Sequence, residues 1–241
     1  MKNRTSSRSE GDLRDVRIET HINPYAEGSC KIAFGHTEII CTVSIQDKVP
    51  LWMRGKRTGW ITAEYGMLPR ATGERKDREA TKGRQEGRTI EIQRLIGRSL
   101  RCACDLKSLD GLTFWLDCDV IIADGGTRTA SITGAWVALA LALKNAVANG
   151  KIKEMPVLRQ IAAVSCGLSE SGVLVDLDYA EDSAILADSN FVMDSDGQWI
   201  EVQMSAERGV VRDEEFLEMQ RLAKAAIEKL FVLQRQALEA A

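Results

Sequence analysis

Three short stretches near the beginning of the chain have the composition of β-strands. Val16–Thr20, Cys30–Phe34 and Glu38–Ile45 are rich in β-branched residues, and Glu27-Gly28-Ser29 and Gly35-His36 separate them. Branched side chains favour strands, while polar pairs that contain glycine favour tight turns. The pattern predicts three consecutive strands that pair antiparallel.

Two helices are predicted in the middle of the chain. From Thr89 onward, apolar residues recur with helical spacing at Ile92, Leu95, Ile96, Leu100 and Ala103, opposite Arg94, Arg98 and Arg101. This spacing is typical of an amphipathic helix. Ala130–Asn149 is apolar on almost all sides and ends at Gly150, which suits the left-handed position after a helix. We expect this second helix to lie in the core.

The rest of the chain alternates between strand-like and helix-like segments. Further strands are expected at Leu112–Ile122, Ile161–Leu168, Val173–Asp178, Asn190–Met193 and Ile200–Gln203. A C-terminal helix is expected to begin with Asp213 as its cap, because acidic side chains favour the first turn of a helix. This order predicts an α/β fold of the mixed α+β kind, with mixed sheets packed against helices in a single domain over residues 1–241.

Two parts of the chain lack hydrophobic periodicity. Residues 1–14 are polar, and we expect them to form a mobile start. The stretch from Pro50 to Gly87 is rich in glycine and charged side chains, and it is long for a connection without structure. Loops of that length are usually functional or disordered.

Composition and charge exclude several classes of protein. The chain has 241 residues, 44% of them hydrophobic, and a formal net charge of -3, so any nucleic acid must be bound by a local basic patch. Its six cysteines include no CxxC pair, which argues against a zinc site and predicts buried free thiols and a cytoplasmic location. The polar N-terminus lacks the apolar run of a secretory signal, and Ala135–Ala148 is too short to span a bilayer. We therefore expect no membrane role.

The segment Ala123–Ser131 has the chemistry of an anion-binding site. Its two glycines allow close backbone approach at a helix start, where unpaired amides favour an anion such as phosphate. Arg128 would add a charged fork and Thr127 a hydroxyl donor. Alternatively, the glycines form only a turn, and Thr129 or Ser131 caps the helix. The spacing is not that of a Walker A loop, so binding of nucleoside triphosphates gains no support.

Basic residues gather earlier in the chain, between Arg54 and Arg88. This stretch carries ten basic and five acidic side chains, a net charge of +5 in an acidic chain. With Trp60 and Tyr65 it has the cations and flat rings that single-stranded nucleic acid requires, although a solvated loop would have the same composition. Arg88 also lies at a predicted helix start, where the dipole disfavours a cation unless it meets an anion or points into water.

Acidic residues gather in the second half of the chain, at Asp176, Asp178, Glu181, Asp182 and Asp188. Carboxylates this close in sequence repel one another. They require water, hydrogen bonds, arginine partners or a hard cation such as Mg²⁺ or Mn²⁺. The glycine and glutamate positions of an EF-hand loop are absent, so the pattern is not that of this calcium site.

Taken together, these segments resemble the ribonuclease PH family, in the same order and over almost the whole chain. The matching stretches are Gly59–Arg70, Gly87-Arg88-Thr89, Glu91–Ile96, Leu116–Ala135, Asp176–Ser183 and Ile200–Gln203. An ordered set of this length is very specific. The resemblance implies a fold of the ribosomal protein S5 domain 2-like kind.

The resemblance also implies roles for individual residues. Inorganic phosphate, the co-substrate, would be held by Arg88, Gly126, Thr127 and Arg128. The catalytic pair Asp182 and Asp188 would form the acidic half of the site, where it binds a divalent metal, Mg²⁺ or Mn²⁺, or assists proton transfer. The loop that grips RNA would contain Arg70, Arg75 and Arg78.

The activity that the resemblance implies is phosphate-dependent 3′–5′ removal of nucleotides from tRNA precursors and other structured RNA such as rRNA. Nucleoside 5′-diphosphates would be released, and the reverse nucleotidyltransferase reaction would add nucleotides. The implied assembly is a ring-shaped homohexamer, built as a trimer of dimers. Two alternatives stay open, an inactive RNA-binding ring subunit and a metal-dependent hydrolytic nuclease.

One departure from the family pattern lies beside the predicted phosphate site. Glu86 directly precedes Gly87 and Arg88. A carboxylate that faced the site would weaken the binding of phosphate. We expect Glu86 to point away from the site or to pair with a neighbouring arginine.

Overall fold

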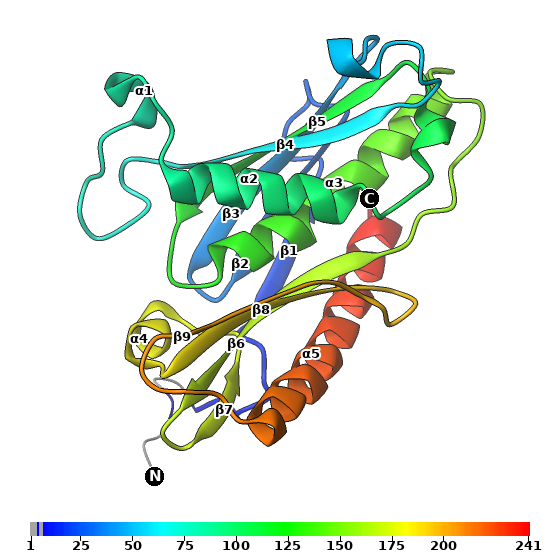
Figure 1. Cartoon of the computed structure of the whole chain (residues 1–241). Coiled ribbons are helices and arrows are strands. Elements are labelled where there is room, and N and C mark those ends of the chain that lie inside the picture. The colour runs from blue at the N-terminus through cyan, green and yellow to red at the C-terminus, as the bar shows by residue number, and fades with distance from the viewer. Residues whose placement is uncertain (1–3, 5–6) are drawn as a thin grey trace.

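The computed structural model describes residue 4 and residues 7–241, and these residues form two β-sheets with helices between and beside them (Figure 1). The first sheet has five strands in the order β1-β2-β3-β5-β4, and the second has four in the order β7-β6-β8-β9. Helix α3 (Thr127–Ala148) lies between the sheets and packs on β2 and β3 of the first and β6 of the second. The mixed α/β fold is confirmed.

The first sheet begins as the predicted meander. Its antiparallel strands are β1 (Val16–Thr20), β2 (Gly28–Phe34) and β3 (Thr37–Gln46), and β3 pairs antiparallel with β5 (Thr113–Ile122). The edge strand β4 (Trp60–Met67) pairs parallel with β5. A parallel pair needs a long crossover, and α2 (Gly87–Leu100) lies in that connection.

The stretch from Pro50 to Gly87, which the sequence indicated to be a long loop, contains regular structure. Besides β4, this stretch contains a 3₁₀ turn at Leu51–Met53 and the short helix α1 (Glu79–Lys82). In β4, buried side chains alternate with more exposed ones, as a strand with one covered face requires. The alternation is short and lies among many charged residues, so the sequence alone did not indicate a strand.

The second sheet is antiparallel throughout. It consists of β6 (Ile161–Ser169), β7 (Gly172–Val175), β8 (Ala187–Asp194) and β9 (Trp199–Ala206). The predicted strand Val173–Asp178 ends earlier, because Asp176 adopts a left-handed backbone with φ of 55°. Asp178 instead caps the short helix α4 (Tyr179–Ala184), which was not predicted.

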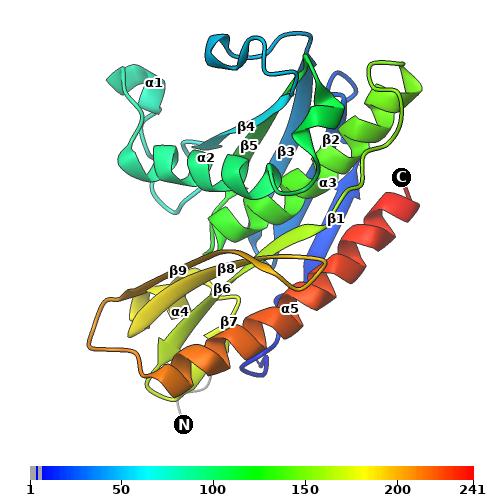
Figure 2. The same ribbon diagram turned by 45° about the vertical axis from the view of Figure 1, so that its right-hand side comes forward.

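Helix α5 (Asp213–Glu239) runs beside β6 and β7 and reaches α3 with its C-terminal half (Figure 2). Its cap is Arg212, and not Asp213 as predicted, because Glu215 accepts a hydrogen bond from the Arg212 amide at 2.9 Å. A second 3₁₀ turn, Leu106–Leu109, precedes β5.

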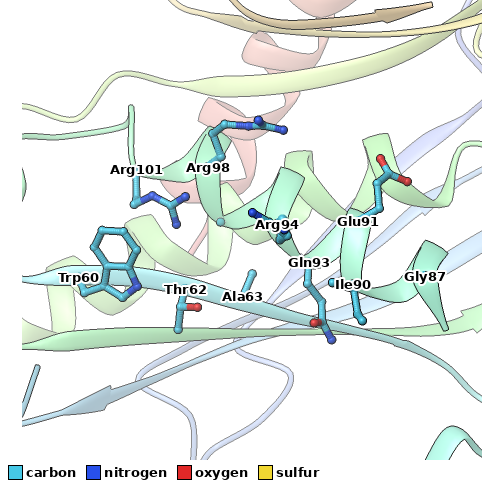
Figure 3. Close-up of a pocket in the computed structure, with 11 residues that line it drawn as sticks. Trp60, Thr62, Ala63, Gly87, Ile90, Glu91, Gln93, Arg94, Arg98 and Arg101 are labelled. Atoms are coloured by element: carbon cyan, nitrogen blue, oxygen red, sulfur yellow. The ribbon is translucent and has the colours of Figure 1, made fainter. Parts of the chain in front are cut away.

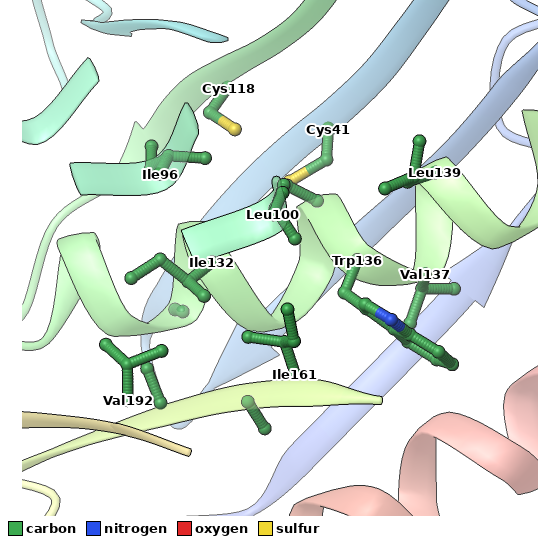
Figure 4. Close-up of a cluster of buried hydrophobic side chains, with 14 of the residues drawn as sticks. Cys41, Ile96, Leu100, Cys118, Ile132, Trp136, Val137, Leu139, Ile161 and Val192 are labelled. Carbon is green, nitrogen blue, oxygen red and sulfur yellow. The ribbon is translucent and has the colours of Figure 1, made fainter. Parts of the chain in front are cut away.

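One continuous cluster of buried side chains surrounds α3 and extends into both sheets (Figure 4). Trp136, Val137 and Leu139 of the helix belong to it, as do Ile161 of β6 and Leu100 of α2. By length and composition α3 could cross a membrane, but 83% of its most apolar window is buried inside the protein. Its apolar surface is therefore used as the core, as expected.

All six cysteines are free thiols, as predicted. Five of them are buried, whereas Cys102 is exposed. Cys102 lies two residues after the end of α2, next to its C-cap Arg101, and its thiol donates to the Arg98 carbonyl at 3.7 Å. The prediction of buried thiols is wrong at this position, because the chain turns outward where the helix ends.

The polar start of the chain differs from the predicted mobile segment. Arg4 donates to Glu181 at 2.9 Å, and the buried Arg14 donates to Asp176 at 2.7 Å. Residues 1–3 and 5–6 lie outside the described residues. Charged composition suggested mobility, but the acidic cluster further along the chain supplies partners for these arginines.

Gly28→Ala tests the close contact between β2 and α3. A Cβ at Gly28 would overlap the carbonyl oxygen of Ala138, so the strand and the helix would have to separate. We expect the free energy of unfolding to fall by about 1–3 kcal/mol. Urea unfolding followed by circular dichroism measures the change.

Gly73→Ala is the matched control, because nothing lies within 4 Å of a Cβ added there. Its free energy of unfolding should change by less than about 0.5 kcal/mol. Equal unfolding midpoints for the two variants would contradict the contact.

Candidate active site

The glycine turn before α3 leaves the first amides of the helix open. Gly125 and Gly126 have φ of 75° and 66°, a left-handed backbone that other residues rarely adopt. The helix begins at Thr127, three residues earlier than predicted, and no side chain of the described residues caps it. Thr129 and Ser131 donate instead to the carbonyls of Gly126 and Thr127, at 2.9 and 2.8 Å. The alternative that these hydroxyls cap the helix is therefore wrong.

A small cavity of about 60 Å³ lies at this helix start. All six predicted phosphate and catalytic residues line it: Arg88, Gly126, Thr127, Arg128, Asp182 and Asp188. They come from four elements, since Arg88 belongs to α2, Asp182 to α4 and Asp188 to β8. The structure thus brings together residues that lie up to a hundred positions apart in the sequence.

The two carboxylates of the cavity influence each other. Partial burial raises the pKa of Asp182, and the neighbouring Asp188 raises it further. Arg88 and Arg128 act in the opposite direction and stabilise the charged carboxylate. Negative and positive groups therefore face the same small space, as a reaction between two phosphates requires.

The acidic half of the site offers few ligands to a metal. Among the described residues, no group of three or more His, Cys, Asp or Glu side chains is placed to hold an ion. Asp182 and Asp188 can supply two carboxylates. This number fits Mg²⁺, which is often bound through one or two carboxylates and takes its other ligands from water and substrate phosphates.

Two residues that support the site, Glu91 and Gln203, were not singled out from the sequence, and the buried Tyr65 has a different role from the RNA-stacking ring that the sequence indicated. Arg128 donates from Nη1 to Glu91 Oε1 at 3.3 Å and to Gln203 Oε1 at 3.2 Å. The buried Tyr65 donates its hydroxyl to Thr127 Oγ1 at 2.9 Å. Glu91, Gln203 and Tyr65 all lie in the stretches that match the family, so membership in those stretches was the available signal.

Tyr65 remains a hydrogen-bond donor because it stays protonated. Its ring is only 5% exposed, and burial raises the pKa of its hydroxyl. The hydrogen bond to Thr127 opposes this shift. Tyr65 thereby ties β4 to the first turn of α3.

The three arginines predicted to grip RNA do not reach the small cavity. Arg70, Arg75 and Arg78 are exposed on the loop between β4 and α2. Arg78 lines a neighbouring cavity of about 490 Å³, which it shares with Arg88. Arg75 pairs with Asp77 at 2.6 Å. The loop is therefore adjacent to the site through Arg78.

Glu86 does not line the small cavity, although it borders the neighbouring cavity that Arg88 also lines. It is exposed and pairs with Lys82 at 3.1 Å, and this ion pair lowers the pKa of its carboxyl. The expectation that Glu86 turns away is confirmed, although its partner is a lysine and not an arginine.

A larger groove of about 760 Å³ follows α2 beside the edge strand β4 (Figure 3). Arg94 and Arg98 border it, and the Arg101 guanidinium lies 4.4 Å from the centre of the Trp60 ring. The groove borders the active site at Glu91, but neither Asp182 nor Asp188 lines it. Size alone therefore does not identify the site, which is the smaller cavity.

Comparison with known proteins gives matches over most of the chain. Models of the 3′ exoribonuclease family match residues 12–144 as its domain 1 and residues 159–226 as its domain 2. Ribonuclease PH of two Caulobacter vibrioides strains is 54% identical to this chain over 235 residues, which is 98% of this chain and 99% of the relative. The two family models divide the chain between residues 144 and 159, whereas one buried hydrophobic cluster extends through both parts. The single domain over residues 1–241 therefore stays a prediction.

Solved structures with a similar fold have much lower sequence identity. Rrp46 of rice (Oryza sativa) is 20% identical, with a TM-score of 0.77 over 96% of this chain and 98% of that chain. A chain of the Archaeoglobus fulgidus exosome with RNA bound to the active site is 22% identical, with a TM-score of 0.78 over 95% of this chain and 91% of that chain. These likenesses agree with the predicted S5 domain 2-like fold. By its sequence and its family models, this chain belongs to the 3′ exoribonuclease family, as a member of its ribonuclease PH branch.

Proposed function

We propose that the protein is a phosphate-dependent 3′–5′ exoribonuclease. Its substrates are the 3′ ends of tRNA precursors and of other structured RNA such as rRNA. One observation carries the proposal. Two arginines and the open amides of α3 surround the same cavity as two aspartates. The arginines and amides suit an attacking phosphate, and the aspartates could serve the leaving oxygen by holding a divalent metal or by assisting proton transfer.

In the proposed reaction, an oxygen of inorganic phosphate attacks the phosphorus of the last internucleotide linkage in line. The bond from that phosphorus to the 3′ oxygen of the preceding nucleotide breaks. The terminal nucleotide leaves as a nucleoside 5′-diphosphate, and the RNA becomes one residue shorter. The reverse reaction adds a nucleotide from a diphosphate.

Electrostatics decides whether the two phosphates can approach each other. Both are anions, and their repulsion must be offset by fixed positive charge. Arg88, Arg128 and the amides near Thr127 would provide this charge, and Arg128 needs little reorganisation because Glu91 and Gln203 already hold it. A divalent metal, Mg²⁺ or Mn²⁺, held by Asp182 and Asp188 would neutralise charge on the leaving oxygen.

The RNA is proposed to reach the site along the loop that carries Arg70, Arg75 and Arg78. This loop is exposed, basic and adjacent to Arg88. We also propose that six copies form a ring, as a trimer of dimers, so that their basic loops gather around one channel. A cytoplasmic location is proposed on the free state of all six cysteines.

Two other functions deserve comparison with this proposal. An inactive RNA-binding subunit would have no need for the paired aspartates and arginines that line the cavity. A hydrolytic nuclease would activate water through the aspartates and gain little from a phosphate seat. A short 3′-extended RNA, incubated with and without phosphate, separates all three. Phosphate-dependent diphosphates support the proposal, monophosphates indicate hydrolysis, and unchanged RNA indicates an inactive subunit.

Arg128→Ala is expected to lower the rate of phosphate-dependent trimming by about 10²–10³-fold, because a fixed positive group at the phosphate is lost. RNA affinity should stay within about 2-fold, since the basic loop is intact. Chromatography of released diphosphates and fluorescence anisotropy of labelled RNA measure the two quantities.

Arg98→Ala serves as the matched control. Arg98 is an exposed arginine of α2 that pairs with Glu201 at 2.8 Å and does not line the small cavity. Its rate should stay near that of the wild type. Unchanged diphosphate release by Arg128→Ala would remove the basis of the phosphate site.

Replacing Arg70, Arg75 and Arg78 together with alanine should weaken RNA binding and reduce its dependence on salt. Each lost phosphate contact lowers the slope of log K against log salt by about 0.7 for single strands, so up to about 2 is expected for three. Anisotropy titrations over a series of KCl concentrations measure this slope.

The control replaces three exposed basic residues of α5, Arg221, Lys224 and Lys229, in the same way. Both triple variants lose the same charge, so only a local contact distinguishes them. An identical slope in both would rule out the proposed role of the loop.

A further inference from the structure

Arg14 is a buried arginine outside the cavity, and it contacts the two chain segments that lead to the two halves of the active site. Its side chain is 7% exposed. One end of the guanidinium pairs with Asp176, through Nη2 at 2.7 Å and Nε at 3.1 Å. The other nitrogen, Nη1, donates to the carbonyl of Asp124. Arg14 therefore connects the chain before α4 with the chain before α3.

The Asp124 end of this connection is the start of the glycine turn. Nη2 of Arg14 also lies 3.4 Å from the Gly125 carbonyl. A Cβ at Gly126 would come within 3.0 Å of the same nitrogen. The guanidinium thus fits directly against the turn whose amides face the proposed phosphate.

The Asp176 end leads to the catalytic aspartate. Asp176 is 1% exposed and has the left-handed φ of 55° that ends β7. Two residues later, Asp178 caps α4 by accepting from the Glu181 amide at 2.8 Å. Asp182 follows within α4. Asp176 therefore lies at the start of the short segment that leads into α4 and to Asp182, a segment that Arg8 also contacts through Asp176 and Glu181.

The segment before α3 and the segment before α4 also pack closely against each other. A Cβ at Gly125 would overlap the carbonyl oxygen of Leu177 and come within 2.7 Å of the Asp178 carbonyl carbon. The Tyr179 amide donates to Asp124 Oδ1 at 3.3 Å. A shift of either segment would thus be passed to the other.

We propose that Arg14 and Asp176 are positioning residues, which fix the phosphate-binding turn relative to Asp182. The inference rests on the proposed phosphorolytic function. Neither residue lines the cavity, so both act through the segments that they hold. Only a planar guanidinium has donors enough to bind a carboxylate on one side and two carbonyls on the other.

Arg14→Lys keeps the charge but removes this geometry. We expect the KM for phosphate to rise at least about 10-fold, because misplacement by an ångström is enough to cost up to about 100-fold. RNA affinity should remain within about 2-fold. A loss of folded protein would lower kcat and leave the phosphate KM unchanged, so the KM separates positioning from stability.

Asp176→Asn is the second variant, since it has the same shape and loses one acceptor and the charge. It should raise the phosphate KM in the same way, and the double variant should be no worse than the more impaired single one. Arg101→Lys is the control, because Arg101 is a half-buried arginine that likewise donates to a backbone carbonyl, that of Ile61 at 3.0 Å, and contacts neither the glycine turn nor Asp176. Its phosphate KM should match that of the wild type.

Unchanged phosphate KM in both Arg14→Lys and Asp176→Asn would overturn the inference. Failure of both variants to fold would overturn it too, since the pair would then serve stability alone. The wild type, assayed in parallel, tests the proposed function separately. If the wild type releases no diphosphates, this result contradicts the proposed function and not the proposed role of Arg14 and Asp176.

Discussion

The active site depends on the burial of α3 between two sheets. Because both sheets cover this helix, its axis and its N-terminus are fixed by the core, and Gly28 allows β2 to approach its backbone. A helix start held in this way presents amides that cannot turn aside or fray. The proposed anion site is therefore a consequence of core packing, and the arginines and aspartates lie around a helix start that the core holds in place.

Much of this arrangement could be predicted from the sequence, because its signals are local. Strands β1 to β3, the helices around Leu95 and Trp136, and the glycine turn all follow from residue type and spacing within short stretches. The convergence of Arg88, Arg128 and Asp182 did not follow from spacing. It was expected only because the ordered motifs resembled a family, and the cavity shows that the expectation was right.

What the sequence did not reveal depends on contacts between distant segments. Strand β4 is stabilised by parallel pairing with β5, about fifty residues away, and no turn motif in the sequence indicates such a pair. The hydrogen bond from Tyr65 to Thr127 and the ion pair of Arg14 with Asp176 likewise join residues far apart in the chain. A polar residue in a sequence gives no sign of the partner that will bury it.

The partners of Arg128 explain how a site for anions can exist before an anion arrives. An arginine with few water contacts requires acceptors, and without them it would turn toward Asp182 and close the cavity. Glu91 and Gln203 accept from Nη1 alone, and in the bonds made among the described residues Nε and Nη2 take no part. A guanidinium has donors on all three nitrogens. The side chain is thus held from one side, which leaves its remaining donors for the phosphate that we propose to bind there.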